Sequence, residues 1–87
     1  MAKITTDERT LQTTAECFLE KENYAKTFAV EGIGSMWKRG STVIDITVHK
    51  GYCSAIFMID PYIIVRVNDE PYIIHTEKEV KELLANL

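Results

Sequence analysis

The chain has 87 residues, of which 46% are hydrophobic and 26% are charged, and its formal net charge is −3. This length allows a single domain, residues 1–87, and the hydrophobic fraction is that of a globular protein, so the composition argues against disorder. The acidic balance disfavours non-specific nucleic-acid binding, which needs a basic face that releases counterions. Basic residues are in excess only within 32–59, which contains Lys38, Arg39 and Lys50 against Asp45.

The sequence shows neither a membrane span nor a secretory signal. Its longest apolar run covers only residues 55–59, and the first dozen residues lack an apolar segment. Two cysteines, Cys17 and Cys53, are fewer than small secreted domains usually contain. We therefore expect a reducing, cytoplasmic location and no membrane partner. A bridge between the two cysteines stays open.

An amphipathic helix is predicted to begin near Thr5. Thr5 can cap the helix, and Glu8 three residues later completes a capping box. The acidic residues Asp7 and Glu8 also suit the positive end of the helix dipole. Apolar residues then recur at helical spacing, namely Leu11, Ala15, Phe18 and Leu19. We expect this helix to end near Asn23.

Residues 24–41 allow two interpretations. A short strand is indicated by the alternation of Phe28, Val30 and Ile33, with two glycines nearby that are typical of a bulge or a close backbone approach. The alternative is a continuation of the first helix that ends at Gly32. We favour the strand.

Residues 43–75 have the pattern of an antiparallel β-meander. They alternate between apolar and polar and are interrupted by turns at Lys50-Gly51, Asp60-Pro61 and Asn68-Asp69. An even-numbered turn at Gly51 aligns apolar residues on one face, pairing Val48 with Cys53, Ile46 with Ala55 and Ile44 with Phe57. A three-residue turn would pair polar with apolar residues, so we favour the even-numbered turn, which buries Cys53.

The C-terminal part is predicted to contain two more strands and a helix. Residues 62–67 and 72–75 read as strands, and Pro71 places the second one near a sheet edge. Thr76 caps the helix with Glu79, and apolar residues follow at helical spacing, namely Val80, Leu83, Leu84 and Leu87. The predicted fold is α+β, an antiparallel meander of four or five short strands with an N-terminal and a C-terminal helix packed on it.

The sequence gives little support for a catalytic site or a metal site. The soft ligands Cys17, His49, Cys53 and His75 lack the close spacing of zinc sites, so we expect no metal and no cofactor. Cys53 with a histidine is the one conceivable nucleophile and base, but burial on an apolar face disfavours a thiolate. The residues 32–35 lack the third glycine and the lysine of phosphate-binding loops. We therefore expect no enzyme; a small enzyme built on Asp45, His49 or Cys53 is the last alternative.

Residues 36–41 form the best local candidate for binding. They place Trp37 beside Lys38 and Arg39, on an expected loop before a strand. Tryptophan and arginine are enriched at binding hot spots, and a ring beside cations can also stack on a nucleobase. The alternative is that Trp37 caps the core and the two cations are a solvated turn.

The meander also has more apolar side chains than one sheet face needs. Ile56 and Met58 point away from the predicted core face, and either Ile73 or Ile74 must do the same. One helix on each face could cover both sides; otherwise the uncovered residues form an interface for a dimer or another partner.

The sequence thus predicts a non-enzymatic protein-binding module. We expect a protein partner or self-association, and an inhibitor or adaptor of a larger complex, of the kind that phages and mobile elements encode. The predicted partner-binding residues are Trp37, Lys38, Arg39, Ile56 and Met58. The alternative from a different class is nucleic-acid binding through the loop of Trp37, Lys38 and Arg39, which the net charge disfavours.

Overall fold

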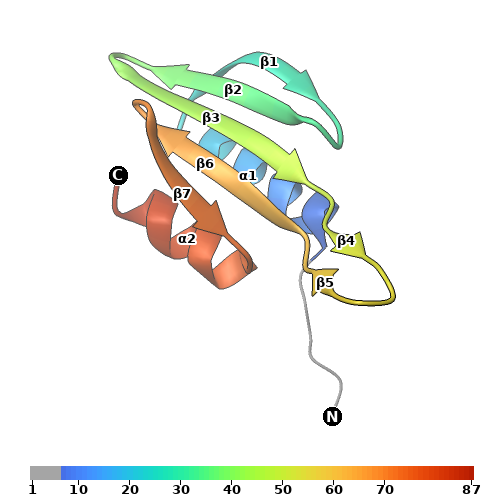
Figure 1. The fold of residues 1–87 in the computed structure, drawn as a ribbon. Coiled ribbons are helices and arrows are strands. Elements are labelled where there is room, and N and C mark those ends of the chain that lie inside the picture. The colour runs from blue at the N-terminus through green and yellow to red at the C-terminus, as the bar shows by residue number, and fades with distance from the viewer. Residues whose placement is uncertain (1–6) are drawn as a thin grey trace.

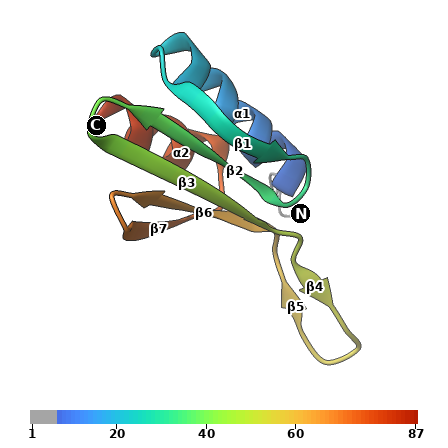
Figure 2. The ribbon, with the colours of Figure 1, turned by 90° about the horizontal axis from the view of Figure 1, so that it is seen from above.

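Two helices lie on one face of a five-stranded antiparallel sheet, and a two-stranded hairpin projects from one end of it (Figure 1, Figure 2). The computed structural model describes residues 7–87. Its elements are α1 (Glu8–Lys21), β1 (Ala25–Val30), β2 (Gly34–Arg39), β3 (Thr42–His49), β4 (Tyr52–Cys53), β5 (Met58–Ile59), β6 (Tyr62–Val67), β7 (Glu70–Ile74) and α2 (Glu77–Ala85). The main sheet has the order β1-β2-β3-β6-β7, and β4 pairs with β5. The predicted α+β class is confirmed, with five strands in the main sheet.

Asp7 caps the first helix. Its carboxylate accepts a hydrogen bond from the backbone N–H of Thr10 at 2.7 Å, which satisfies one of the unpaired donors at the helix start. The same hydrogen bond lowers the pKa of the Asp7 carboxyl below its ordinary value. The predicted cap at Thr5 lies outside the described residues, so Asp7 is the cap that the structure shows.

The chain after α1 is a strand, which confirms that interpretation over a helical extension. The helix ends at Lys21, near the predicted end, because Asn23 adopts a φ of 66°, a left-handed conformation typical of helix termini. β1 then pairs with β2, with an irregular register between Lys26 and Phe28. The predicted loop at 36–39 is wrong, since these residues belong to β2.

The predicted register of the first hairpin is wrong. β3 pairs with β6, so Val48 lies opposite Ile63 and His49 opposite Tyr62, and Cys53 is exposed rather than buried. The prediction pairs β3 with residues 53–59 because these present apolar side chains on one face. β6 presents Ile63, Val65 and Val67 with the same two-residue period, so apolar matching alone does not separate the two pairings.

Residues 50–61 instead form the projecting hairpin, here called the arm. A tight turn at Ser54 interrupts the expected strand: its hydroxyl accepts hydrogen bonds from the backbone N–H groups of Ile56 and Phe57 at 3.2 and 3.1 Å. The Ser54 N–H also donates to the Phe57 carbonyl at 2.9 Å. These bonds reverse the chain within four residues and leave β4 and β5 only two residues long.

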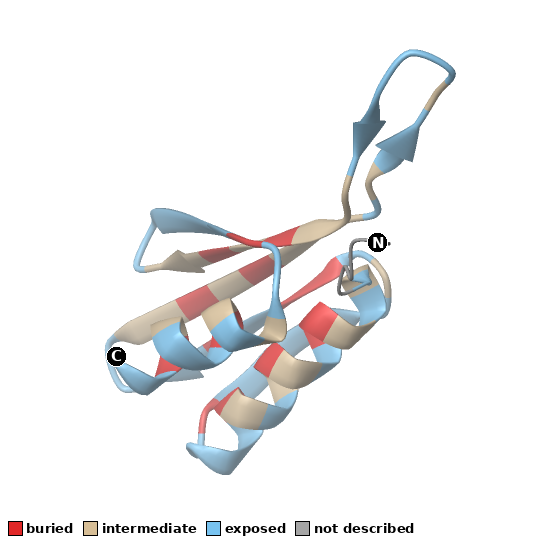
Figure 3. Ribbon diagram, turned by 90° about the horizontal axis from the view of Figure 1, so that it is seen from below, coloured by how far each residue is buried: buried red, intermediate tan, exposed pale blue. Residues whose placement is uncertain are grey.

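One hydrophobic core lies between the helices and the sheet. The buried positions face one another across this layer, whereas the arm is exposed along most of its length (Figure 3). The core comprises Leu11, Ala15, Leu19, Tyr24, Trp37, Ile44, Ile46, Ile63, Val65, Ile74, Val80 and Leu84. Each helix contributes one apolar face, as the periodicity predicts.

The capping box of α2 is confirmed. The Thr76 hydroxyl accepts a hydrogen bond from the Glu79 N–H at 3.2 Å and donates to the Glu79 carboxylate at 3.2 Å. That carboxylate also accepts from the His75 N–H at 3.2 Å. This arrangement satisfies backbone donors at the start of the helix and determines where β7 gives way to α2.

Candidate protein-binding surface

The face of the main sheet opposite the helices, here called the open face, carries many apolar side chains. Successive residues of a strand point to opposite faces, and Ser35, Ile46 and Val65 form a buried row toward the helices. The neighbouring rows therefore face away from them. One row contains Val30, Gly34, Thr47, Ile64 and Ile73, and the other contains Phe28, Met36, Asp45, Arg66 and Pro71.

The open face has exposed apolar side chains on its outer strands and an ion pair on its central strands. Phe28 and Ile73, on the two outer strands, are 54% and 59% exposed. On the central strands, Asp45 and Arg66 lie opposite each other, with Oδ2 and Nη1 3.9 Å apart. Because the two charges offset each other, the centre of the open face carries no net charge.

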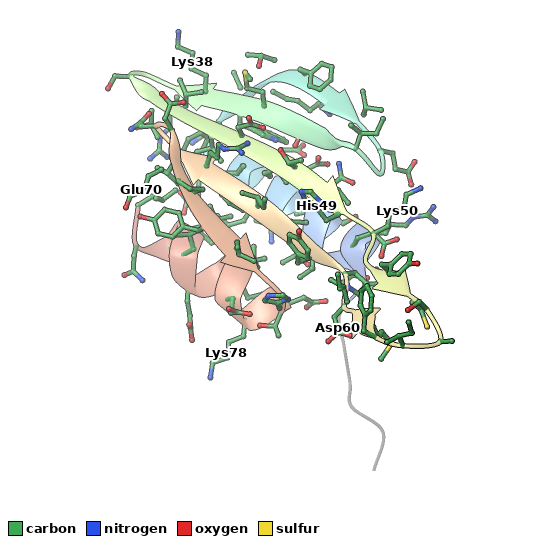
Figure 4. The ribbon with its side chains drawn as sticks, in the orientation of Figure 1. Lys38, His49, Lys50, Asp60, Glu70 and Lys78 are labelled. Atoms are coloured by element: carbon green, nitrogen blue, oxygen red, sulfur yellow. The ribbon has the colours of Figure 1, made fainter. Side chains whose placement is uncertain are left out.

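Three rings join the open face to the arm. The His49 ring stacks on Tyr62 with centroids 4.6 Å apart and planes 10° from parallel, and the His75 ring lies 5.6 Å from the other side of Tyr62. His49 lies at the end of β3, and Lys50 and Asp60 follow at the base of the arm (Figure 4). The two histidines thus pack on an aromatic ring. Within residues 7–87, no group of three His, Cys, Asp or Glu residues is close enough to hold a metal ion.

The arm presents a second set of apolar side chains. Ile56 at its tip is 90% exposed and Met58 69%, and the Tyr52 and Phe57 rings lie 5.4 Å apart. No charged residue occurs in 51–59. Gly51 permits the exit from the sheet because its φ is 82° and an added Cβ would lie 2.8 Å from the Pro61 nitrogen. The arm is therefore an apolar projection with its charges confined to its base.

The five predicted partner-binding residues divide into two groups. Ile56 and Met58 lie in the arm and not in the main sheet, where the sequence placed them. Trp37 is 2% exposed, and its indole N–H donates to the Ser35 hydroxyl at 2.9 Å, so the indole belongs to the core. Lys38 and Arg39 are exposed at the end of β2 far from the arm (Figure 4).

The expected combination of tryptophan and cations does not form one surface. The Arg39 guanidinium lies 4.4 Å from the Tyr24 ring centroid and donates to the Glu22 carbonyl. Arg39 thus packs on the segment that follows α1. Because Trp37 is buried on the opposite side of the strand from Lys38, the indole and this ammonium do not face the same partner.

Sequence reasoning missed most of the surface. The exposed side chains of β1 and β2 were not recognised, and neither were three in the arm: the full set missed is Phe28, Val30, Met36, Tyr52, Phe57 and Ile59. Of the two alternatives on β7, Ile73 is the exposed residue and Ile74 is buried. A signal was present, because β1 and β7 place apolar residues at positions that point away from the core. These positions indicate an exposed apolar surface only when it is known which sheet face the helices cover.

Comparisons of the chain with protein-family models, with curated proteins and with solved structures give no match. Among the described residues, no helix has the length and apolar character needed to span a membrane.

Proposed function

We propose that the chain is a non-enzymatic protein-binding module that contacts its partner through the open face and the arm. The observation that carries this proposal is the placement of both helices on the same side of the sheet (Figure 2). Neither helix covers the opposite side, where the apolar side chains of both sets remain exposed.

The exposed apolar area is large for a chain of this size. A large apolar side chain presents roughly 150–250 Å² when fully exposed. Nine side chains of the two sets are about half exposed or more on average: Phe28, Val30, Met36, Ile73, Tyr52, Ile56, Phe57, Met58 and Ile59. The two sets together present on the order of 900 Å², divided between the open face and the arm; a single apolar patch on a typical monomer covers at most about 300–600 Å².

Burial of this surface supplies a driving force for binding. At about 25 cal/mol per Å², covering even half of it contributes on the order of 10 kcal/mol before the costs of association. Tyrosine, phenylalanine and methionine are also the residue types enriched in interface cores, and charged residues are depleted there. The uncharged part of the arm, 51–59, matches that composition.

We propose an inhibitor or adaptor role because a projecting apolar arm can occupy a groove of a larger protein while the open face covers its rim. We place this role in the cytoplasm, since Cys17 and Cys53 are free and exposed and free thiols persist in reducing compartments. The proposed link to phages and mobile elements rests on the small size and the acidity of the chain.

The test is capture of a partner by immobilised chain from lysate of the source cell, with three variants. Ile56→Asp and Ile73→Lys alter the arm and the open face, and Leu87→Asp alters an exposed apolar residue after α2 as a matched control. We expect a partner that the parent and Leu87→Asp retain and the first two variants lose. A partner retained equally by all four proteins would refute the proposed surface.

A further inference from the structure

We infer that the partner of this surface is a second copy of the chain, with each arm lying across the open face of the other copy. This inference rests on the proposed function: the arm and the open face that would bind a larger protein bind a second copy of the chain when that protein is absent. It follows from the shape, size and charge of the two parts of the surface.

The shape of the chain suits a reciprocal contact. The arm bends away from the helix layer, toward the side of the open face (Figure 2, Figure 3). The open face and the arm are therefore the two limbs of an L. Two such L-shaped copies related by a two-fold axis can interlock, because a two-fold interface uses the same patches on both copies and closes after two.

The arm is long enough to cover the larger part of the width of the open face. Outside the turn at 54–57, each leg of the arm, 50–53 or 58–61, has four residues, and at about 3.3 Å per residue it reaches about 13 Å. The main sheet has five strands about 4.8 Å apart, which places its outer strands about 19 Å from each other. One arm therefore reaches from the exposed Ile73 on β7 of a partner over the central strands of its open face, without crossing to β1.

The buried area would be that of a stable dimer. A standard interface buries about 800 Å² on each partner. The nine exposed apolar side chains on the arm and open face offer on the order of 900 Å² by themselves. In the reciprocal arrangement each copy contributes both its arm and its open face, whereas a contact between two arms alone would leave the open faces exposed.

The charges permit two copies to approach over this surface. Each copy carries a net charge of −3, so like-charge repulsion disfavours most relative orientations. The arm between 51 and 59 has no charge, and on the open face Asp45 and Arg66 form a neutral pair. The proposed contact thus brings together the least charged parts of both copies.

The first test is the mass of the purified full chain in sedimentation velocity between about 1 and 100 μM. We expect twice the single-chain mass of 9.9 kDa for the parent and for Leu87→Asp. Ile56→Asp and Ile73→Lys each appear twice in a symmetric dimer, so we expect each to weaken the dimer by at least about 100-fold. A monomeric parent at 100 μM, or a dimer that neither variant weakens, would overturn the inference.

The second test distinguishes an arm on an open face from two arms in contact. A mixture of Ile56→Asp with Ile73→Lys can form a mixed dimer in which one arm–face contact is intact. The two substitutions then meet in the other contact with opposite charges. We expect the mixture to dimerise more tightly than either variant alone, as seen by native mass measurement. No such recovery would overturn the reciprocal arrangement.

These outcomes separate the inference from the proposed function. A monomeric parent that nevertheless captures a foreign protein in an Ile56-dependent manner overturns self-association and leaves the binding module intact. A monomeric parent that captures nothing overturns both.

Discussion

Removal of the Trp37 side chain decides whether this residue belongs to the core or to a binding site. The indole is 2% exposed, so Trp37→Ala removes roughly 200–250 Å² of buried surface, an upper bound of about 5–6 kcal/mol. Core tryptophan truncations cost about 3–5 kcal/mol. Small domains are stable by about 5–15 kcal/mol, so we expect Trp37→Ala to be unfolded or nearly so.

Two milder variants report on the buried hydrogen bond. Trp37→Phe keeps most of the apolar volume but leaves the buried Ser35 hydroxyl without its indole donor, which costs about 1–3 kcal/mol. Adding Ser35→Ala removes the other partner, so we expect the double variant to be about 1 kcal/mol more stable than the sum of the single effects.

The assay is urea unfolding followed by far-ultraviolet circular dichroism, together with the partner-capture and mass measurements at low urea. We expect Trp37→Phe to fold and to bind as the parent does, because the indole lies on the side of β2 that faces the helices. Folded Trp37→Ala with parental stability and lost binding would refute the reasoning, since it would show that the indole contacts a partner.

Three further predictions test other parts of the structure. Thr76→Ala should lower the free energy of unfolding by about 1 kcal/mol in urea titrations, since it removes the cap of α2; an unchanged midpoint would contradict that cap. Gly51→Val should disturb amide chemical shifts within 50–61 and abolish binding while the core shifts stay, because β-branched residues disfavour its φ of 82°; shifts unchanged in the arm would count against the geometry. The pKa of Asp7 is lowered by its hydrogen bond with Thr10, so the carboxylate stabilises the fold above the pKa of an unfolded aspartate and this contribution is lost as pH falls through the folded value. The stability difference between the parent and Asp7→Asn should therefore vanish in acid, and a constant difference from pH 7 to pH 2 would exclude this role.

The local elements were predictable because their signals are local. The Thr76 and Glu79 pair defines the start of α2, and the periodicity from Val80 to Leu84 defines its buried face. The strand at Phe28 followed from alternation. The pairing partner of Val48 could not be predicted in this way. Cys53 and Ile63 both place an apolar side chain on the same face of a strand, so the alternation fits either partner. The turn at Ser54, which takes Cys53 out of the main sheet, decides for Ile63.

The candidate surface was predictable only in part. The sequence showed that apolar residues exceed the needs of one sheet face, and it singled out Ile56 and Met58. The sequence also pointed to Trp37 as a binding residue. A large aromatic side chain suits a buried position and a binding site equally well, so the residue type does not distinguish the two roles. Burial separates these two uses, and burial depends on the whole fold.

By itself, the sequence determined the two amphipathic helices, the antiparallel strands, the acidic balance and the surplus of apolar side chains, because each depends on composition or short-range spacing. Only the tertiary structure decided which sheet face is covered. Each helix has a single apolar face that could pack on either side of the sheet, and α1 and α2 also contact each other, so both occupy one side. The surplus apolar residues were therefore left on the other side and in the arm, where we place the binding surface.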